Sequence, residues 1–243
     1  MFEIKRTVSC SDVGTDSELT LGAAIDFMQG CSMFQLNSLK ALAEYFAKYN
    51  IGMYLASRQV DIIRTPVYGE NLIIRTWIYD CKRAYGYRNT IIYDEDGCPC
   101  ITSYAIGAFV NLITEKLYCM PKDIIKSAPL YDKFSMEYLS RKIAIPKNEA
   151  IMANPTIVSK YHLDYNKHVN NAKYISIAEE YLPENFKTKR IRIEYKTPAK
   201  YKDILIPNIY RINENSFVVN LCNDQGGSYA VVEFNKKNCT EIK

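Results

Sequence analysis

The stretch "DIIRTPVYGENLII" (61–74) has a counterpart in "IEYKTPAKYKDILI" (193–206). When the two are aligned, the Thr-Pro pair at 65–66 falls on the Thr-Pro pair at 197–198. In each stretch, apolar residues rich in Ile and Val stand on both sides of a polar, turn-forming centre, which is typical of two strands joined by a turn. Such self-similarity at long range predicts a chain built from two similar units.

The rest of the chain repeats the same order of signals. A helical pattern of apolar residues covers residues 20–49, and a shorter one covers 171–182. Laying Ile25 on Ile177 places Asp12 on Asp164. Each half then contains β-rich segments and one strong hairpin turn, which is "DEDG" in the first half and "NDQG" in the second. The first half has about twenty extra residues after its helix.

One helix followed by several antiparallel strands in each half predicts an α+β fold, in which a helix covers one face of each sheet. We expect an N-terminal unit at 1–140 and a C-terminal unit at 150–243. The polar segment "SRKIAIPKNEA" (140–150) would join them. The alternative is one large α+β domain whose halves are similar by accident.

The composition is that of a globular protein. Of 243 residues, 48% are apolar and 24% are charged. A net charge of +4 is too small to indicate a nucleic-acid partner, although it would suit an acidic macromolecule. No apolar run has the length of a signal peptide or a membrane span. We therefore expect a cytoplasmic protein without a membrane partner.

The eight cysteines are scattered along the chain. Cys98 and Cys100 flank a proline, but no second close pair completes a tetrahedral metal site. No glycine-rich loop precedes a helix, as phosphate binding would require. These patterns favour reduced thiols and predict no metal site.

The candidate site is "HLDYNKHVNNAKYI" (162–175), which has Asp164, Asn166 and His168 at alternate positions. In an extended strand these three side chains would share one face. One of the two asparagines that follow is a good N-cap for the next helix. His168 would then lie close to a helix N-terminus, where N–H donors and the helix dipole favour a developing negative charge.

This arrangement suits the hydrolysis of an ester or thioester, which needs a base to activate water and donors to hold the oxyanion. Histidine titrates in the right range, and a carboxylate can orient it. The alternative remains open at this point, because Asp, Asn and His before a helix are also ordinary turn and capping residues. His162 is expected to be structural.

The segment "DYNKHVNNAKY" (164–174) resembles the D-x-N-x-H-V-N-N-x-x-Y signature of the acyl-acyl carrier protein thioesterases, the bacterial relatives of the plant plastid enzymes. The likeness extends over nearly the whole chain, through "IDFMQGCS" and "TPVYGENLIIRTW" in the first half. It implies a tandem hotdog fold, in which each unit wraps an antiparallel sheet around a helix. It also implies hydrolysis of acyl-acyl carrier protein to free fatty acid, with no cofactor. The implied partner is acyl carrier protein with its phosphopantetheine-linked acyl chain.

The resemblance assigns catalysis to Asp164, Asn166 and His168. Asn170 matches a family asparagine at the helix start and is at most a substrate contact. The acyl chain is assigned mainly to a pocket of the first unit. His168 and Asp164 would transfer protons while Asn166 and helix N–H groups hold the carbonyl oxygen.

There is one departure from the family pattern. Pro198 stands where relatives carry a glutamate proposed to help catalysis, and Ala199 stands where plant members have a cysteine. An acyl-CoA thioesterase of the hotdog type, or a non-catalytic module that binds acyl carrier protein or acyl chains, are the alternatives. Acyl chain length, and the choice between monomer and homodimer, stay open.

Overall fold

A computed structural model describes residues 1–236 of the chain. The chain forms two compact units, and each is described by itself. Unit 1 comprises Met1–Ala56 and Ile63–Tyr138, and unit 2 comprises Ser57–Ile62 and the chain from Leu139 onward. The expected ranges, 1–140 and 150–243, differ from these in two places, because residues 139–149 and residues 57–62 both belong to unit 2. Residues 57–62 belong to unit 2 because they pair with one of its strands.

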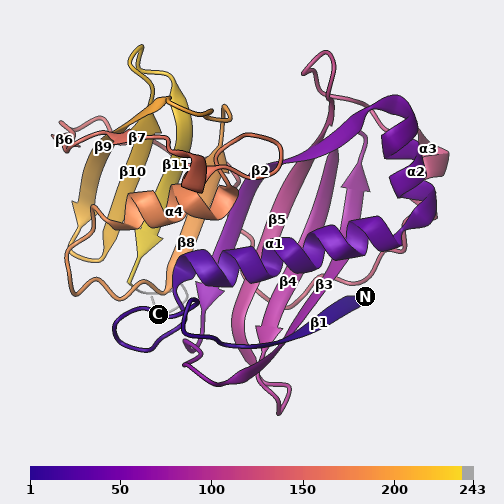
Figure 1. The fold of residues 1–243 in the computed structure, drawn as a ribbon, viewed down its shortest axis with the longest axis horizontal. Helices are drawn as coiled ribbons and strands as arrows, with labels where there is room; N and C mark the ends of the chain where they lie inside the picture. Colours follow the sequence, from indigo (N-terminus) through magenta and orange to yellow (C-terminus); the bar gives the residue numbers. More distant parts are fainter. Residues whose placement is uncertain (237–243) are drawn as a thin grey trace. The chain divides into compact units, whose positions relative to one another are not determined.

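Unit 1 is an antiparallel sheet with a long helix across one face (Figure 1). Its strands are β1 (Phe2–Thr7), the first half of β2 (Ile51–Ile62), β3 (Asn71–Lys82), β4 (Tyr85–Tyr93) and β5 (Pro99–Asn111). Its helices are α1 (Leu21–Ser38), α2 (Lys40–Tyr49) and α3 (Lys122–Ser127). The strand order is β1-β3-β4-β5-β2. The extra residues of the first half of the chain therefore form α2.

Unit 2 has the same plan with a shorter helix. Its strands are the second half of β2, β6 (Ile151–Met152), β7 (Thr156–Ile157), β8 (Arg190–Tyr195), β9 (Ile204–Asn213), β10 (Ser216–Cys222) and β11 (Ser228–Asn235). Its helices are the 3₁₀ turn η1 (Lys160–His162) and α4 (Asn171–Glu179). The order is β2-β8-β11-β10-β9-β6, with β7 also on β9. The prediction of an α+β chain with one helix over a sheet in each half is confirmed.

The two sheet-covering helices bury the same spacing of residues, as a helix face packed on a sheet must. In α1 the first buried positions are Gly22, Ala24, Ile25, Phe27 and Met28. In α4 they are Ala172, Tyr174, Ile175, Ile177 and Ala178. Ile25 therefore corresponds to Ile175, and the alignment of Ile25 with Ile177 was wrong by two residues.

The loops before the helices correspond in the same register. The N–H of Thr20 donates to the carbonyl of Asp12 at 2.9 Å, and the N–H of Asn170 donates to the carbonyl of His162 at 2.8 Å. Asp12 is thus the counterpart of His162, and Gly14 that of Asp164. The expected match of Asp12 with Asp164 is corrected accordingly.

The aligned Thr-Pro pairs are also displaced, by one residue. In unit 1 the turn before β3 has Gly69 at φ 81°, and in unit 2 the turn before β9 has Lys202 at φ 73°. Their N–H groups donate to the equivalent carbonyls of Val8 and Val158, each at 2.9 Å. The left-handed residue of the turn sets the register, so Pro66 corresponds to Ala199 and not to Pro198.

The interior of unit 1 beneath α1 contains a polar layer. The guanidinium of Arg88 on β4 donates to the side chain of Gln35 on α1 and, at 3.0 Å, to the hydroxyl of Thr76 on β3. All three side chains are buried. Beyond this layer lies an apolar cluster at the C-terminal end of α1. It consists of Leu36, Leu42, Phe46, Ile51, Phe109 and Met120.

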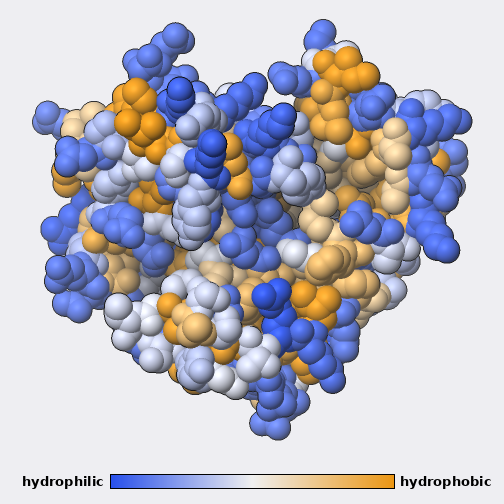
Figure 2. Space-filling view, viewed as in Figure 1, coloured by the Kyte–Doolittle hydropathy of each residue, from blue (hydrophilic) through white to orange (hydrophobic). Residues whose placement is uncertain are grey.

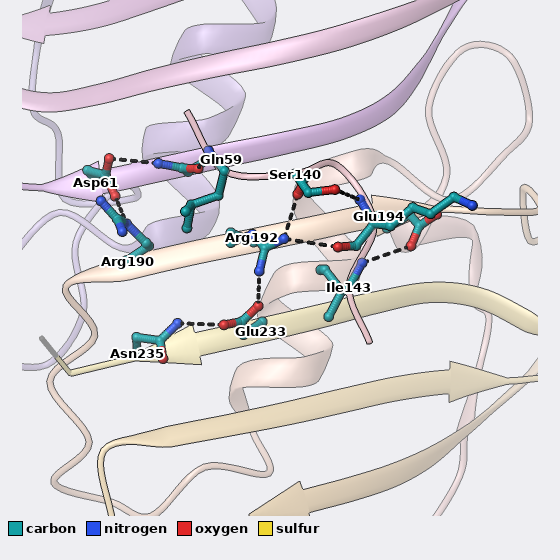
Figure 3. Close-up of polar contacts among 11 residues, drawn as sticks. Gln59, Asp61, Ser140, Ile143, Arg190, Arg192, Glu194, Glu233 and Asn235 are labelled. Carbon is teal, nitrogen blue, oxygen red and sulfur yellow. Dashed lines mark hydrogen bonds and ion pairs between the residues drawn. The ribbon is translucent and has the colours of Figure 1, made fainter. Parts of the chain in front are cut away.

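In unit 2 a polar network ties the linker after Tyr138 to one sheet face (Figure 3). Arg190 on β8 pairs with Asp61 on β2, and both are buried. Gln59 accepts from the N–H of Leu139 at 3.2 Å, and Glu194 accepts from that of Ile143 at 3.2 Å. Because the charges have partners, their burial is tolerated.

The length of the helices and the state of the cysteines are two further features of the fold. Within residues 1–236, no helix is long and apolar enough to cross a membrane. The seven cysteines in that range are free thiols, and Cys239 lies outside the described residues.

Candidate functional site

The residues around Asp164, Asn166 and His168 form a tight turn and not the extended strand that their alternation suggested. Lys160–His162 is a 3₁₀ turn. After it, the N–H of Asp164 donates to the carbonyl of His168 at 2.8 Å, and the N–H of Lys167 donates back to Asp164 at 3.0 Å. Lys167 closes this turn with φ 61°. All three candidate residues therefore still lie in one turn, which spans the five consecutive positions 164–168.

The carboxylate of Asp164 stabilises this turn by accepting backbone N–H groups within it. Its Oδ1 accepts the N–H of Asn166 at 2.8 Å and that of His168 at 3.4 Å. Aspartate and asparagine commonly close turns by accepting the N–H two residues ahead. Asp164 therefore has a positioning role toward both other residues of the motif, whereas the side chain of Asn166 is exposed.

A second loop, residues 198–203, lies beside the turn. His168 forms an antiparallel bridge with Lys200, and the N–H of Val169 donates to the carbonyl of Ala199 at 2.9 Å. The hydroxyl of Tyr174 accepts the N–H of Ala199 at 2.8 Å. Burial raises the pKa of Tyr174, so this hydroxyl stays protonated. The bracing role of Tyr174 was not predicted, although it is the last letter of the signature.

The helix start is capped as expected. Asn170 is the N-cap of α4, and its Oδ1 accepts the N–H of Ala172 at 2.9 Å. The N–H of Lys173 donates to the carbonyl of Asn170 at 2.9 Å. These two N–H groups already have partners within the chain, so they are not the donors expected for a substrate oxygen. The positive end of the helix dipole remains beside His168.

His162 has the structural role expected of it. Its Nδ1 accepts the N–H of Ser159 at 3.1 Å and so closes the 3₁₀ turn. Burial, and after it the charge of Lys173, lower the pKa of His162. The equivalent contact in unit 1 is made by Asp12, whose Oδ2 accepts the N–H of Ser9 at 2.9 Å.

At positions 198 and 199, where the family resemblance led us to expect a glutamate and a cysteine in relatives, this chain has neither a carboxylate nor a thiol. Pro198 is exposed and Ala199 is fully buried. The carboxylate of this loop, Asp203, accepts the N–H of Lys200 at 2.8 Å. Glu70 does the same in unit 1, accepting the N–H of Val67 at 3.0 Å. Asp203 is therefore a turn-forming residue. Within residues 1–236, no group of His, Cys, Asp and Glu is arranged to hold a metal ion.

Comparison with known proteins identifies the family to which the chain belongs. Residues 1–128 match the family model of the acyl-ACP thioesterase N-terminal domain, and residues 146–234 match that of the C-terminal domain. A palmitoyl-acyl carrier protein thioesterase of the chloroplast of Arabidopsis thaliana is 22% identical over 221 residues, covering 84% of this chain and 54% of the relative. The chain spans about half the length of the curated relatives it matches.

Solved structures show the same fold. An acyl-ACP thioesterase from Bacteroides thetaiotaomicron superposes with a TM-score of 0.86 at 18% identity, covering 96% of both chains. A 12:0-ACP thioesterase from Umbellularia californica gives 0.84 at 17% identity, again with 96% of both chains covered. Both unit architectures and the expected double hotdog fold are thereby confirmed. Since the two domain models together match most of the sequence, the chain belongs to the acyl-ACP thioesterase family.

Proposed function

We propose that this protein hydrolyses the thioester of acyl-acyl carrier protein and releases a free fatty acid, which ends chain elongation. The observation that carries the proposal is the turn of unit 2. It presents His168 beside the N-terminus of α4, within a chain matched by both acyl-ACP thioesterase domain models.

The chemistry needs few groups, because a thioester is already an activated acyl group. The imidazole of His168 removes a proton from water as the water oxygen attacks the carbonyl carbon. The side-chain amide of Asn166 and the dipole of α4 stabilise the tetrahedral oxyanion. The carbon–sulfur bond then breaks, and the proton on His168 passes to the leaving thiolate. General-base assistance is worth about 10²–10⁴-fold and an oxyanion donor about 10²–10³-fold.

Asp164 supports this chemistry by holding the turn. One of its oxygens is engaged by the N–H groups of Asn166 and His168, so we assign proton transfer to His168 alone. Asn170 caps α4 through its Oδ1, and any contact with substrate is made by its Nδ2 donor.

The acyl chain is assigned to unit 1, beneath α1. The apolar positions Ile25 and Met28 line the first half of this helix, before the polar layer at Gln35. Unit 2 then supplies the catalytic turn. We place the reaction in the cytoplasm, because the seven cysteines within residues 1–236 are free thiols, which suits a reducing compartment.

The second candidate function is a non-catalytic module that binds acylated carrier protein, and it is favoured by Pro198. The test measures the release of free fatty acid from acyl carrier proteins that bear acyl chains of graded length, and from the matching acyl-CoA esters. It distinguishes the hydrolase of acyl carrier protein from the two alternatives. The expected result is turnover with preference for the carrier protein. If the parent bound acylated carrier protein saturably without releasing fatty acid, and Pro198→Glu gained turnover, the protein would be the non-catalytic binding module instead. Preference for acyl-CoA would indicate an acyl-CoA thioesterase.

A further inference from the structure

Strand β1 has one open edge in the part of the chain that the structure describes. It is the outermost strand of unit 1 and pairs with β3 alone (Figure 1). In an antiparallel pair, every second residue directs its N–H and C=O groups away from the neighbouring strand. The N–H of Val8 donates to the carbonyl of Glu70, which continues the register of β1 on β3. The even-numbered residues therefore bond to β3, whereas Glu3, Lys5 and Thr7 direct their backbone groups outward.

The side chains of β1 alternate between the two faces of the sheet. Ile4 is half-buried, and the guanidinium of Arg6 lies 4.5 Å from the ring centroid of Phe27 on α1. The even-numbered side chains are therefore on the face that the helix covers. The side chains of Glu3 and Lys5 are exposed on the opposite face. Figure 2 shows hydrophobic and strongly hydrophilic residues side by side over β1.

The equivalent edge of unit 2 is interrupted. Val158 occupies the place of Val8 in the register given above, so Pro155 stands where unit 1 has Lys5. The strand there is β7, whose two residues pair with β9. A proline at an outward-directed position has no N–H for a further strand, and prolines commonly protect sheet edges in this way. Because unit 2 forms with so short a strand at this place, folding alone does not require an uninterrupted β1.

The sequence of β1, FEIKRT, is complementary in charge to itself when two copies run antiparallel. A twofold pairing of two such strands places one residue opposite its own copy. If that residue is Ile4, then Glu3 lies opposite Lys5 of the second copy, and Phe2 lies opposite Arg6. A shift of the centre by one residue would place Glu3 opposite Glu3, or Lys5 opposite Lys5, and like charges directly opposite are destabilising. Only the pairing centred on Ile4 therefore brings opposite charges together.

This pairing also satisfies groups that the single chain leaves open. Among residues 1–236, Lys5 has no carboxylate partner, whereas Glu3 pairs with Arg75 of β3 at 2.9 Å. In the pairing centred on Ile4, Lys5 gains a carboxylate, and the outward N–H and C=O groups of Glu3 and Lys5 bond to each other across the two copies. Exposed charges on an edge disfavour an unrelated apolar strand. The occupant that fits this edge is therefore a second copy of the chain.

We propose that β1 is an interface between two copies of this chain, which pair antiparallel about Ile4 and join the sheets of their first units into one continuous sheet. This is strand addition at a sheet edge, in which backbone hydrogen bonds supply affinity and the side chains set the register. The contact is short and charged, so we expect a dimer in exchange with the monomer. The inference does not depend on the proposed function, because β1 contains none of the residues assigned to catalysis.

The test reverses one charge at a time. Lys5→Glu places carboxylates opposite each other across the two copies, and Glu3→Lys places ammonium groups opposite each other. An equimolar mixture of the two variants restores opposite charges in the mixed dimer. The control variant, Lys116→Glu, makes the same change of charge at an exposed position outside β1. Sedimentation velocity over a series of protein concentrations gives the dissociation constant of each dimer, and circular dichroism confirms that each variant is folded.

The parent and Lys116→Glu should form the same dimer. Lys5→Glu and Glu3→Lys should each raise its dissociation constant roughly 5- to 1,000-fold, because both symmetry-related pairs change from attraction to repulsion. The equimolar mixture should return the dissociation constant toward that of the parent. Added sodium chloride should weaken the dimer of the parent and strengthen that of Lys5→Glu.

A second measurement tests the register without the charge variants. Residues opposite each other in a non-hydrogen-bonded pair have Cα atoms about 4.5 Å apart, which is within the range that a disulfide bridges. Ile4→Cys should therefore form a disulfide between its two introduced thiols under mild oxidation. Mass spectrometry of the linked peptides shows whether the bond joins position 4 of both copies or one of the other exposed cysteines.

The proposal would be overturned if the parent sedimented as a monomer at every concentration, or if Lys5→Glu weakened the dimer no more than Lys116→Glu does. It would equally fail if the mixture dimerised no better than its two components, or if Ile4→Cys gave no link between the two positions 4.

Discussion

At the scale of single residues, Asp164 is the group whose role the structure defines most closely. Its carboxylate closes the turn that carries Asn166 and His168. An asparagine can accept the same two N–H groups, since both residues form this type of turn. Asp164→Asn should therefore keep kcat within about tenfold of the parent. Asp164→Ala should lower it by about 10²-fold, because small misplacements of catalytic groups have such effects.

Steady-state hydrolysis of acylated carrier protein by the two variants checks this, with circular dichroism to confirm that both are folded. Equal inactivity of Asp164→Asn and Asp164→Ala would show that the charge or the basicity of Asp164 is needed, and our assignment of proton transfer to His168 alone would be abandoned.

At the scale of elements, the 3₁₀ turn η1 contains a pH-sensitive contact. Neutral His162 accepts the N–H of Ser159, and a protonated ring cannot accept it. Burial holds the pKa of His162 below the ordinary value of 6.5, so as the pH falls the unfolded chain takes up this proton first. The contact stabilises the fold fully above pH 6.5. This stability is lost as the pH falls through the lower pKa of the folded state.

His162→Asp should remove this pH dependence, because it introduces the acceptor that Asp12 provides in unit 1. Loss of a capping contact is worth about 0.5–2 kcal/mol. Melting temperatures of the parent and the variant should therefore diverge between pH 7 and pH 5 in favour of the variant, because burial lowers the pKa of His162 in the folded protein. Parallel pH profiles would be inconsistent with this role.

Glu179, at the end of α4, makes the stability of the fold depend on pH in the opposite direction. Burial, and then the neighbouring Glu180, raise the pKa of Glu179 to about 7. The folded state therefore retains this proton between pH 4.5 and about pH 7, and stability is lost as the pH rises through that window.

Glu179→Gln should stabilise the protein at pH 8 by about 1–3 kcal/mol. It should have little effect at pH 4.5, where the carboxyl of Glu179 is already protonated in the folded protein. Urea unfolding at the two pH values measures the difference, and Glu184→Gln, at an exposed position after α4, serves as the control. The same change in stability at both pH values would mean that the carboxyl of Glu179 is not destabilised by burial.

At the scale of the whole molecule, the sequence predicted the duplication but not which residue of unit 1 corresponds to which residue of unit 2. The repeated Thr-Pro pairs and hairpin turns predicted two similar units. The exact equivalence depends on Gly69 and Lys202, which share a left-handed turn although their side chains have nothing in common. The alternation of Asp164, Asn166 and His168 suggested a strand, because a spacing of two cannot distinguish a strand from a turn closed by hydrogen bonds.

The central claim is that the turn of unit 2 hydrolyses acylated carrier protein through His168. Its most direct test is the single-turnover release of free fatty acid from an acyl carrier protein thioester by the parent and by His168→Ala, with binding of holo-carrier protein confirmed for both. We predict release by the parent and a rate roughly 10² or more lower for the variant, with binding unchanged. Equal rates for the two proteins would contradict the account.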